Sequence, residues 1–445
     1  MSGSRVRSRL AVPAIVAVAA AAVIAVVSSG ASKETVPEQP VPATVDLNAT
    51  LTNEMSDTSV LAGFDRKVND YLTYWAINGA SVAVMRNDSL LYAKGYGIAD
   101  TGKQMQPGNI LRVASVSKLI TATGIMVLQE RGLLSLKDKV FGPQGILNDS
   151  VYVAAIKDSL YRKITVEDLL RHRGGFSKKG GDPMFSTRWI MMQNGWTKVP
   201  TQEQLMVVQL KRRLKFEPGT WQEYSNFGYL ALSMVIEKVS GTDYETFIQE
   251  NVLHPAGCIG FRIAGNYYAN KYPEETRYYV QHDDEPAEEF NNSGRKVTRC
   301  YGGNNVKGLS GAGAWVASAP ELALFVASID GKPEIPDIIS RESVDAMTEY
   351  FDENTYALGW NDTKDGNWTR TGTFAGTSAL IKYFSDGECW IFISNTSTYK
   401  GPGLARHTAG LFDALRTKYS SKFPSRNMFC PPQQETPDDA EWFDY

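Results

Sequence analysis

Residues 108–132 read GNILRVASVSKLITATGIMVLQERG, and this stretch carries most of the information about the fold. A loop and a short extended segment lead in, and an apolar helical pattern then runs from about Val116 to Arg131. Gly132 follows, and glycine is the residue type that most often ends a helix. Ser115 therefore stands at the beginning of a predicted helix, and Lys118 follows one turn later on the same face.

The spacing of Ser115 and Lys118 suits nucleophilic catalysis. A serine hydroxyl is a weak nucleophile until a neighbouring group removes its proton, and a lysine one turn away is within reach. The unpaired N–H groups at the helix N-terminus would lie beside the serine as donors of an oxyanion hole. Ser-x-x-Lys alone decides little, because it also occurs at Ser293 and Ser397. Those two serines lie in polar stretches that we predict to be surface loops, and Ser117 is predicted to face away from Lys118.

A second element is Tyr224-Ser225-Asn226, which lies between Glu217-Pro218-Gly219 and a helix predicted from Tyr229 to Val239. A tyrosine can act as a general base when nearby cations lower its pKa. An asparagine amide offers both a donor and an acceptor to an amide-bearing substrate. Tyr268-Ala269-Asn270 has the same spacing but lacks both the Pro-Gly turn and the helix, so Tyr224 is preferred.

The third element, Arg370-Thr371-Gly372, precedes two strands predicted at 378–384 and 389–394. A fixed cation and a hydroxyl on a strand edge can hold a substrate carboxylate. Gly372 would let the backbone of the substrate approach closely.

Ser-x-x-Lys, Tyr-Ser-Asn and Arg-Thr-Gly, in this order, resemble the serine beta-lactamase and penicillin-binding-protein superfamily. The resemblance is strongest to the branch that holds class C beta-lactamases, D-alanyl-D-alanine carboxypeptidases, D-aminopeptidases and related esterases. It spans roughly residues 60–420 and extends to the flanking stretches 164–175, 218–220, 309–319 and 358–360.

The resemblance implies a role for each residue of the first two motifs. Ser115 would be acylated, while Lys118 and Tyr224 would share the removal and return of its proton. Asn226 would bind the amide side of the substrate. The resemblance implies no cofactor and no metal.

The third motif would complete the site. By resemblance, Arg370 and Thr371 would hold the substrate carboxylate or tune Tyr224. The backbone N–H groups of Ser115 and Thr373 would form the oxyanion hole. The family commonly has Lys or His where this chain has Arg370. Arginine keeps the charge but donates protons poorly, so the substitution argues against beta-lactam breakdown as the main activity and is neutral about peptide or ester hydrolysis.

The pattern along the chain predicts helices and strands at both ends and a mostly helical centre. The expected fold class is α/β (α+β) and beta-lactamase-like, with an antiparallel sheet built from both termini, flanked by helices, and an inserted mostly helical lobe. The predicted elements are a helix at 61–77, a hairpin of strands 81–85 and 89–96, helices at 166–171, 202–213 and 320–329, and a final helix at 404–419.

The ends of the chain differ from its centre. Three arginines precede an uncharged run at 10–27, and small residues follow, so 1–31 is predicted to be a signal peptide or an uncleaved signal anchor. The protein would then be exported, as a periplasmic or extracellular protein or one tethered to the membrane by 10–27. Residues 32–58 are predicted to be a flexible linker, 59–430 the hydrolase domain, and 431–445 an acidic disordered tail.

Composition narrows the classes of function. The net charge is -3, with 21% charged residues, which gives no indication of nucleic-acid binding. Neither the histidines nor the cysteines show the spacing of a metal site. His172 is interpreted as structural. Cys258, Cys300, Cys389 and Cys430 allow one or two disulfides, with Cys258–Cys300 the first pair to test, or buried thiols.

The leading hypothesis is an exported serine hydrolase that forms an acyl-enzyme on Ser115. It would hydrolyse a small-molecule or peptide substrate at a peptide, amide or ester bond, related to D-amino acids or derived from peptidoglycan. Two alternatives stay open. One is a true beta-lactamase, and the other is a non-catalytic penicillin-binding-like sensor, which Arg370 and the long tether motivate.

Overall fold

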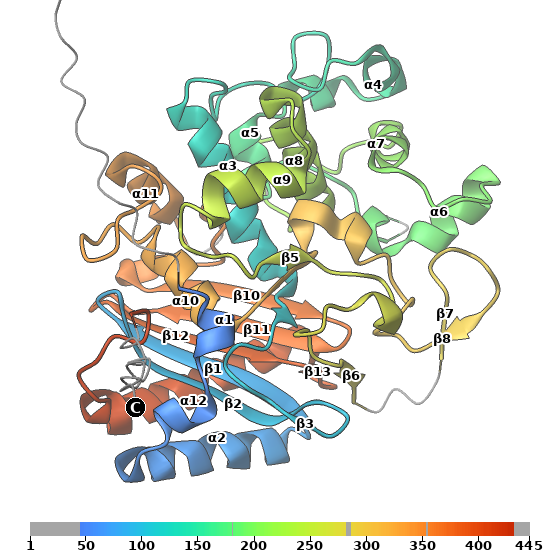
Figure 1. Cartoon of the computed structure of the whole chain (residues 1–445). Helices are drawn as coiled ribbons and strands as arrows, with labels where there is room; N and C mark the ends of the chain where they lie inside the picture. Colours follow the sequence, from blue (N-terminus) through green and yellow to red (C-terminus); the bar gives the residue numbers. More distant parts are fainter. Residues whose placement is uncertain (1–44, 180, 282–285, 353–354, 431–445) are drawn as a thin grey trace, which may run out of the picture. The chain divides into compact units, whose positions relative to one another are not determined.

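A six-stranded antiparallel sheet forms the base of the fold, in the order β10-β11-β12-β1-β2-β3 (Figure 1). Its strands are β1 (Gly79–Arg86), β2 (Ser89–Asp100), β3 (Lys103–Gln104), β10 (Trp368–Phe374), β11 (Thr377–Tyr383) and β12 (Glu388–Ser394). The computed structural model describes residues 45–179, 181–281, 286–352 and 355–430. The predicted signal segment and the acidic tail lie outside the described residues.

The two ends of the described chain meet in the middle of this sheet. β1 pairs with β12 from Ala80↔Ser394 to Arg86↔Glu388, and it pairs with β2 on its other side. Asn87 and Asp88 form the tight turn between β1 and β2 with positive φ angles of 43° and 56°, which asparagine and aspartate tolerate better than most residues. The predictions of the hairpin and of a sheet built from both termini are confirmed.

Two helices cover one face of the sheet, α2 (Ala62–Tyr74) and α12 (Leu404–Tyr419) (Figure 1). Phe64 of α2 packs edge-on against Tyr92 with ring centroids 5.0 Å apart, and Trp390 of β12 lies 5.3 Å from Phe412 of α12. The alternation of side chains along β1 places Val82 and Val84 in this layer and Ala83 and Met85 in the opposite core.

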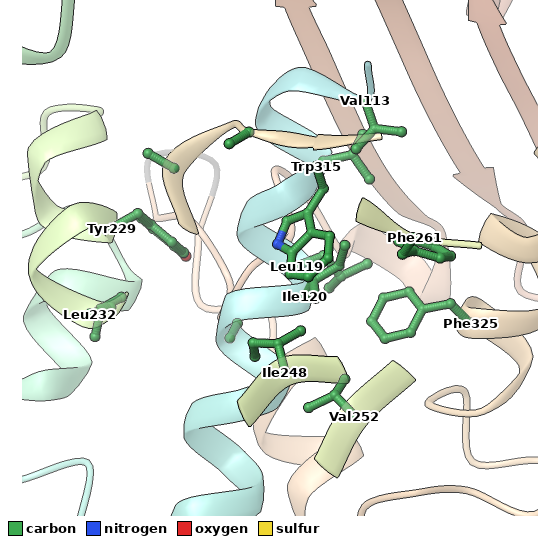
Figure 2. Packing of buried hydrophobic residues seen from close by; sticks show 14 of the residues in the cluster. Val113, Leu119, Ile120, Tyr229, Leu232, Ile248, Val252, Phe261, Trp315 and Phe325 are labelled. Atoms are coloured by element: carbon green, nitrogen blue, oxygen red, sulfur yellow. The ribbon is translucent and has the colours of Figure 1, made fainter. Parts of the chain in front are cut away.

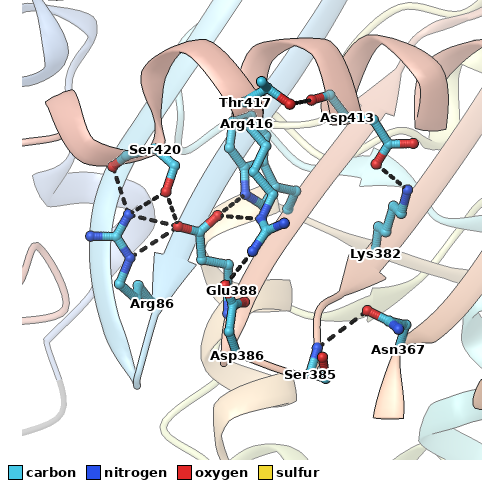
Figure 3. Close-up of polar contacts among 11 residues, drawn as sticks. Arg86, Asn367, Lys382, Ser385, Asp386, Glu388, Asp413, Arg416, Thr417 and Ser420 are labelled. Atoms are coloured by element: carbon cyan, nitrogen blue, oxygen red, sulfur yellow. Dashed lines mark hydrogen bonds and ion pairs between the residues drawn. The ribbon is translucent and has the colours of Figure 1, made fainter. Parts of the chain in front are cut away.

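The end of α12 is held to the sheet by the buried carboxylate of Glu388 (Figure 3). This carboxylate accepts hydrogen bonds from Arg86 Nε at 3.0 Å, Arg416 Nε at 2.9 Å and Trp390 Nε1 at 3.0 Å, and from the Ser420 hydroxyl. Burial alone would raise the pKa of Glu388, but the hydrogen bonds from Ser420 and Trp390 and the charge of Arg86 lower it.

The opposite face carries the helical lobe, whose central element is α3 (Ser117–Glu130). Every residue of α3 from Ser117 to Leu128 is buried, so this helix is covered on all sides. Leu119 and Ile120 belong to the cluster of buried side chains that includes Trp315 and Ile248 (Figure 2). The predicted inserted lobe is confirmed.

Other helices and short strands lie outside the six-stranded sheet. The helices are α4 (Ser150–Ala155), α5 (Val166–Leu170), α6 (Thr187–Asn194), α7 (Gln202–Leu210), α8 (Asn226–Ser240), α9 (Tyr244–Ile248), α10 (Ala319–Ala327) and α11 (Arg341–Thr348). The short strands are β4 (Leu111–Arg112), β5 (Arg262–Ile263) and β9 (Trp315–Ala317) in one sheet, β6 (Tyr279–Val280) with β13 (Thr396–Ser397), and β7 (Ala287–Glu288) with β8 (Lys296–Val297).

The described part of the predicted linker is folded, which corrects the expectation for residues 45–58. A short helix, α1 (Leu47–Thr50), begins at Asp46, and the carboxylate of this aspartate caps its N-terminus. Leu47 and Leu51 are buried in the main core, and Asn48 donates to Glu321 Oε2 at 2.8 Å. The composition of this segment is mostly polar, but Leu47 and Leu51, four residues apart, pack into the core and hold it in place.

One further expectation needs correction. Ser397, expected in a surface loop, is buried in β13, where its Oγ accepts from the backbone N–H of Gly376 at 3.0 Å. The sequence allows either disulfides or buried thiols; in the structure Cys258 and Cys300 are not bonded to each other, and Cys258 Sγ lies 3.3 Å from the carbonyl oxygen of Glu321. Within the described ranges, no helix is long and apolar enough to cross a membrane.

Candidate active site

Ser115 lies where the chain turns into the central helix. A short 3-10 turn, Ala114–Val116, leads directly into α3, and Ser115 is half-buried in it. Ala114 has a positive φ of 48°, a conformation that a residue with a side chain adopts only when its surroundings enforce it. The backbone at the predicted nucleophile is therefore held in a specific and unusual geometry.

Lys118 is fully buried one turn after Ser115. Its Nζ lies 3.1 Å from Ser115 Oγ, 2.8 Å from Asn226 Oδ1 and 2.5 Å from the carbonyl oxygen of Ala312. Burial, reinforced by the nearby charge of Arg370, holds the pKa of Lys118 well below its usual range, and Asp182 opposes this only in part.

Tyr224 approaches Ser115 from the other side. Its hydroxyl donates to Ser115 Oγ at 2.7 Å, and Lys118 Nζ lies 4.8 Å from the centroid of the tyrosine ring. Burial raises the pKa of Tyr224, and the charge of Arg370 offsets this rise only in part.

These pKa directions distinguish the two candidate bases. Lys118 is shifted toward the neutral amine, which can accept a proton, whereas Tyr224 is shifted toward the neutral phenol, which can donate one. The geometry therefore favours Lys118 as the group that takes the proton of Ser115 and Tyr224 as a hydrogen-bond donor to Oγ.

Arg370 is fully buried, and its guanidinium faces the turn of Ser115. Its Nε donates to the carbonyl oxygen of Ser115 at 2.8 Å, and its Nη2 donates to the same oxygen. A guanidinium engaged in this way is not presented to a substrate carboxylate. Of the two roles that the resemblance implies for Arg370, this arrangement favours tuning of Tyr224, and the same charge also lowers the pKa of Lys118.

The rest of the third motif lies on β10, a strand that the sequence analysis did not assign. Thr371 and Thr373 are half-buried on one face of β10, and Arg370 and Gly372 are buried on the other. A Cβ atom at Gly372 would lie 2.2 Å from the carbonyl oxygen of Val113 and 3.0 Å from the backbone nitrogen of Ser115. Gly372 thus allows the edge strand, rather than the substrate, to approach the nucleophile.

Asn226 lies between Lys118 and Asp182 at the start of α8. Its Oδ1 accepts from Lys118 at 2.8 Å, and its Nδ2 donates to Asp182 Oδ2 at 2.8 Å. Asp182 also caps the short 3-10 helix Pro183–Phe185 through a bond from the backbone N–H of Met184. The sequence analysis missed Asp182, whose only signal was an Asp-Pro pair after glycines, which reads as a turn.

His172 lies behind Tyr224 and has a structural position. It has a positive φ of 58°, and its Nδ1 accepts from the backbone N–H of Ser225 at 3.2 Å. Its ring lies 4.3 Å from that of Tyr224, between centroids. Burial, together with the charge of Arg370, holds the pKa of His172 well below its usual range, which favours the neutral imidazole.

Two hollows open at the exposed face of β10. One, of about 570 Å³, is lined by Thr373 together with Phe185, Arg299 and Tyr399. The other, of about 340 Å³, is lined by Thr371 with Tyr356, Asn361 and Gln222. Because Thr371 and Thr373 lie on the same face of the strand, the two hollows offer space for a substrate along the edge of β10.

Known proteins resemble this one both in sequence and in fold. A family model described as Beta-lactamase matches residues 64–414. The putative penicillin-binding protein PbpX of Bacillus subtilis is 25% identical over 332 residues, which cover 74% of this chain and 73% of that protein. A putative D-alanyl-D-alanine carboxypeptidase of Escherichia coli O157:H7 is 23% identical over 69% of this chain and 73% of its own length.

Among solved structures, the D-amino acid amidase of Ochrobactrum anthropi SV3, in complex with L-phenylalanine amide, matches with a TM-score of 0.61 and 17% identity. The match covers 81% of this chain and 99% of the amidase, and it shows a common fold. The family model spans most of the chain and includes the serine, lysine, tyrosine and arginine that converge in the structure. The chain therefore belongs to the beta-lactamase family of serine hydrolases.

Proposed function

We propose that this protein hydrolyses an amide, peptide or ester bond through an acyl-enzyme on Ser115. One observation carries the proposal: a buried lysine amine, which forms no ion pair among the described residues, lies 3.1 Å from the hydroxyl of Ser115. Burying an ammonium group without a counter-ion is costly, so the amine is held in the form that can accept a proton.

The chemistry follows from the donors and acceptors. When Oγ of Ser115 attacks the substrate carbonyl carbon, the hydroxyl proton passes to Nζ of Lys118 and the carbonyl oxygen becomes an oxyanion. The backbone N–H groups of Ser115 and Thr373 are the proposed donors to that oxyanion. The close approach of β10 that Gly372 allows supports this pair. The leaving group then departs with a proton returned by Lys118 or by the hydroxyl of Tyr224, and water hydrolyses the acyl-enzyme.

The substrate class is proposed from the relatives. One relative is named a D-alanyl-D-alanine carboxypeptidase and one structural neighbour a D-amino acid amidase, so we propose a substrate with a D-amino acid at the cleaved bond, such as a peptidoglycan peptide. We also propose that residues 1–31 direct export and that the hydrolase domain acts outside the cytoplasm. N-terminal sequencing of the secreted or membrane-bound protein would test this second proposal.

A labelling experiment tests the nucleophile. A fluorophosphonate should label the wild type on the peptide that contains Ser115, and Ser115→Ala should abolish labelling. Ser293→Ala is the matched control, because it makes the same change in a second Ser-x-x-Lys sequence at an exposed position, and it should leave labelling intact. Labelling that persists in Ser115→Ala would refute the assignment.

A parallel assay tests the substrate class. The mature protein would be incubated with a D-alanyl-D-alanine peptide, a D-amino acid amide, a short ester and nitrocefin. We expect turnover of the D-amino acid substrates, with nitrocefin acylating Ser115 slowly or not at all. Rapid nitrocefin turnover would favour a beta-lactamase, and labelling without turnover of any substrate would favour a sensor.

A further inference from the structure

Asp182 is the one carboxylate among the described residues that shifts the pKa of Lys118, yet it does not contact the lysine. The side-chain amide of Asn226 lies between the two groups, 2.8 Å from each. We propose that Asp182 is a positioning residue that fixes the orientation of the Asn226 amide and thereby directs the lone pair of Lys118 at Ser115. The proposal rests on the proposed function of Ser115 and Lys118.

The orientation of the amide follows from its two neighbours. A carboxylate can only accept hydrogen bonds, so the side of Asn226 that faces Asp182 must be the NH₂ group. The carbonyl Oδ1 then necessarily faces Lys118, which donates to it. Since amide oxygen and nitrogen cannot be told apart by shape, the acidic neighbour is what makes this orientation unique.

The orientation of Asn226 determines what Lys118 can do. A neutral amine has two N–H donors and one lone pair. The two donors are used by Asn226 Oδ1 and the carbonyl oxygen of Ala312, both of which are pure acceptors. The third contact of Nζ is Ser115 Oγ at 3.1 Å, so the lone pair is directed at the hydroxyl proton. An inverted amide would present its NH₂ group to this lone pair and compete with Ser115.

Other groups around Lys118 do not supply this constraint. Arg370 from β10 has its guanidinium on the backbone of Ser115, and the rings of Tyr224 and Tyr229 lie 4.8 and 5.5 Å from Nζ, measured to their centroids. His172 is neutral and bonded to the backbone of Ser225. Of the groups acting on Lys118, Asp182 alone is an anion, and it raises the pKa of the amine while Arg370 lowers it.

The test is the rate of fluorophosphonate labelling, kinact/KI, measured from pH 4 to 9. In this reaction the bond from Oγ to phosphorus forms, the P–F bond breaks, fluoride leaves and the proton of Ser115 passes to Lys118. The readout does not depend on the natural substrate. If labelling does not require Ser115 in the wild type, the proposed function fails, which is a different outcome from a failure of this inference.

Asp182→Asn is the decisive variant. Asparagine caps a helix as well as aspartate, so the bond from the N–H of Met184 is kept. With its oxygen used by that cap, the new side chain presents NH₂ to Asn226 and drives the inverted amide. We expect kinact/KI to fall about 10- to 100-fold, as for the loss of a hydrogen bond to a charged group. The midpoint of the ascending pH limb should move to lower pH, because an anion that raises the pKa of Lys118 is removed.

Two further variants keep the inference falsifiable. Asp182→Ser preserves the cap, but its side chain is too short to reach Asn226. Its kinact/KI should fall by less than about tenfold, because no N–H donor then faces the NH₂ group of Asn226. The double variant Asp182→Asn with Asn226→Asp restores the match of donor and acceptor. It should recover part of the rate lost in Asp182→Asn and move the midpoint to higher pH, since the carboxylate now touches Lys118.

The outcomes separate cleanly. The inference is supported if kinact/KI decreases from the wild type to Asp182→Ser and again to Asp182→Asn, and if the midpoint of the ascending limb moves to lower pH in Asp182→Asn. If kinact/KI falls no further in Asp182→Asn than in Asp182→Ser, and the midpoint of the ascending pH limb does not move, Asp182 serves only as a helix cap. A double variant no faster than Asp182→Asn would likewise overturn the inference. Thermal melting of each variant establishes that the compared proteins are folded.

Discussion

Two buried charged side chains, Glu388 and Lys118, are treated in opposite ways on the two faces of one sheet. Glu388, under α12, receives hydrogen bonds from Arg86, Arg416 and Trp390 (Figure 3). Lys118, in the helical lobe, contacts only neutral oxygens. Burial opposes the charge in both, yet partners keep Glu388 ionised while Lys118 is driven toward its neutral form.

The comparison assigns different roles to the two side chains: Glu388 contributes to the stability of the fold, and Lys118 is proposed to contribute to reactivity. A buried charge with well-placed partners holds elements together, and removing a partner leaves an uncompensated charge. A buried charge without a counter-ion destabilises the folded state, and a lowered pKa favours the neutral amine, which can accept a proton. We therefore expect changes at Lys118 and Glu388 to affect different measurements.

The largest effect on reactivity is expected for Lys118→Met, which keeps the length of the side chain and removes the base. The rate of labelling at Ser115 should fall about 10³-fold or more, the upper part of the range for a general base. Labelling within tenfold of the wild type would show that another group accepts the proton.

The same variant tests the cost of burying Lys118. The folded-state pKa of Lys118 lies below its ordinary value of 10.5, so the unfolded state binds more protons at neutral pH. The cost therefore shrinks as the pH rises toward 10.5. Relative to Lys118→Met, the wild type should gain free energy of unfolding between pH 7 and pH 10, as measured by urea denaturation. A difference that does not change over this interval would mean that Lys118 is charged in the folded protein.

Tyr224→Phe should have the next largest effect, because it removes the hydroxyl that donates to Ser115 Oγ at 2.7 Å. We expect labelling to slow about 100-fold while the ascending pH limb keeps its midpoint, since Lys118 remains the base. A limb that disappears in this variant would instead assign the base to the tyrosine. Tyr74→Phe, which makes the same change at an exposed position of α2, is the control.

Arg370→Met should slow labelling on the ascending limb of the pH profile, where each tenfold loss of the neutral amine corresponds to a rise of about one pKa unit. Arg370 lowers the pKa of Lys118, so its removal should move the ascending limb to higher pH. Arg370→Lys keeps the charge and should keep the midpoint closer to that of the wild type. If Arg370→Met weakens substrate binding and the midpoint of the ascending pH limb does not move, Arg370 would instead bind the substrate carboxylate.

Glu388→Gln should have the smallest effect on labelling and a clear effect on stability. The variant should lose about 2–3 kcal/mol of unfolding free energy, as for hydrogen bonds to a charged group, at an unchanged labelling rate. Because the folded-state pKa of Glu388 lies below 4.5, this contribution is present above that pH and is lost as the pH falls through the folded-state pKa. Equal stability of both proteins at pH 7 would contradict the role of the carboxylate.

Much of the fold could be predicted because its signals are local. The periodicity of α3 and α12, the turn between β1 and β2, and the apolar runs of β11 and β12 each lie in one stretch of chain. β10 was missed because Thr-Arg-Thr-Gly-Thr alternates polar residues with a glycine. Its burial comes from contact with the turn of Ser115, about 250 residues earlier in the chain. The α1 segment was missed for a similar reason, since its partner Glu321 is remote.

The candidate site shows the same limit. Ser115, Lys118 and Tyr224 could be selected because their motifs have characteristic neighbours, and the structure brings their reactive atoms together. The orientation of Arg370 depends on which face of β10 is buried, which no local pattern determines. Asp182 carries no motif at all, and only the position of its carboxylate beside Asn226 reveals it.

The place of β12 between β1 and β11 has a consequence for how the protein becomes active during synthesis. When the segment with Ser115 and Lys118 leaves the ribosome, the partner strand of β1 and the strand that carries Arg370 and Thr373 do not yet exist. Ser115, the proposed nucleophile, therefore remains without the neighbouring Arg370 and without one proposed oxyanion donor until translation has passed β12. We therefore expect the nascent chain to be inactive, and activity to require that β10, β11 and β12 have been synthesised and have joined the sheet.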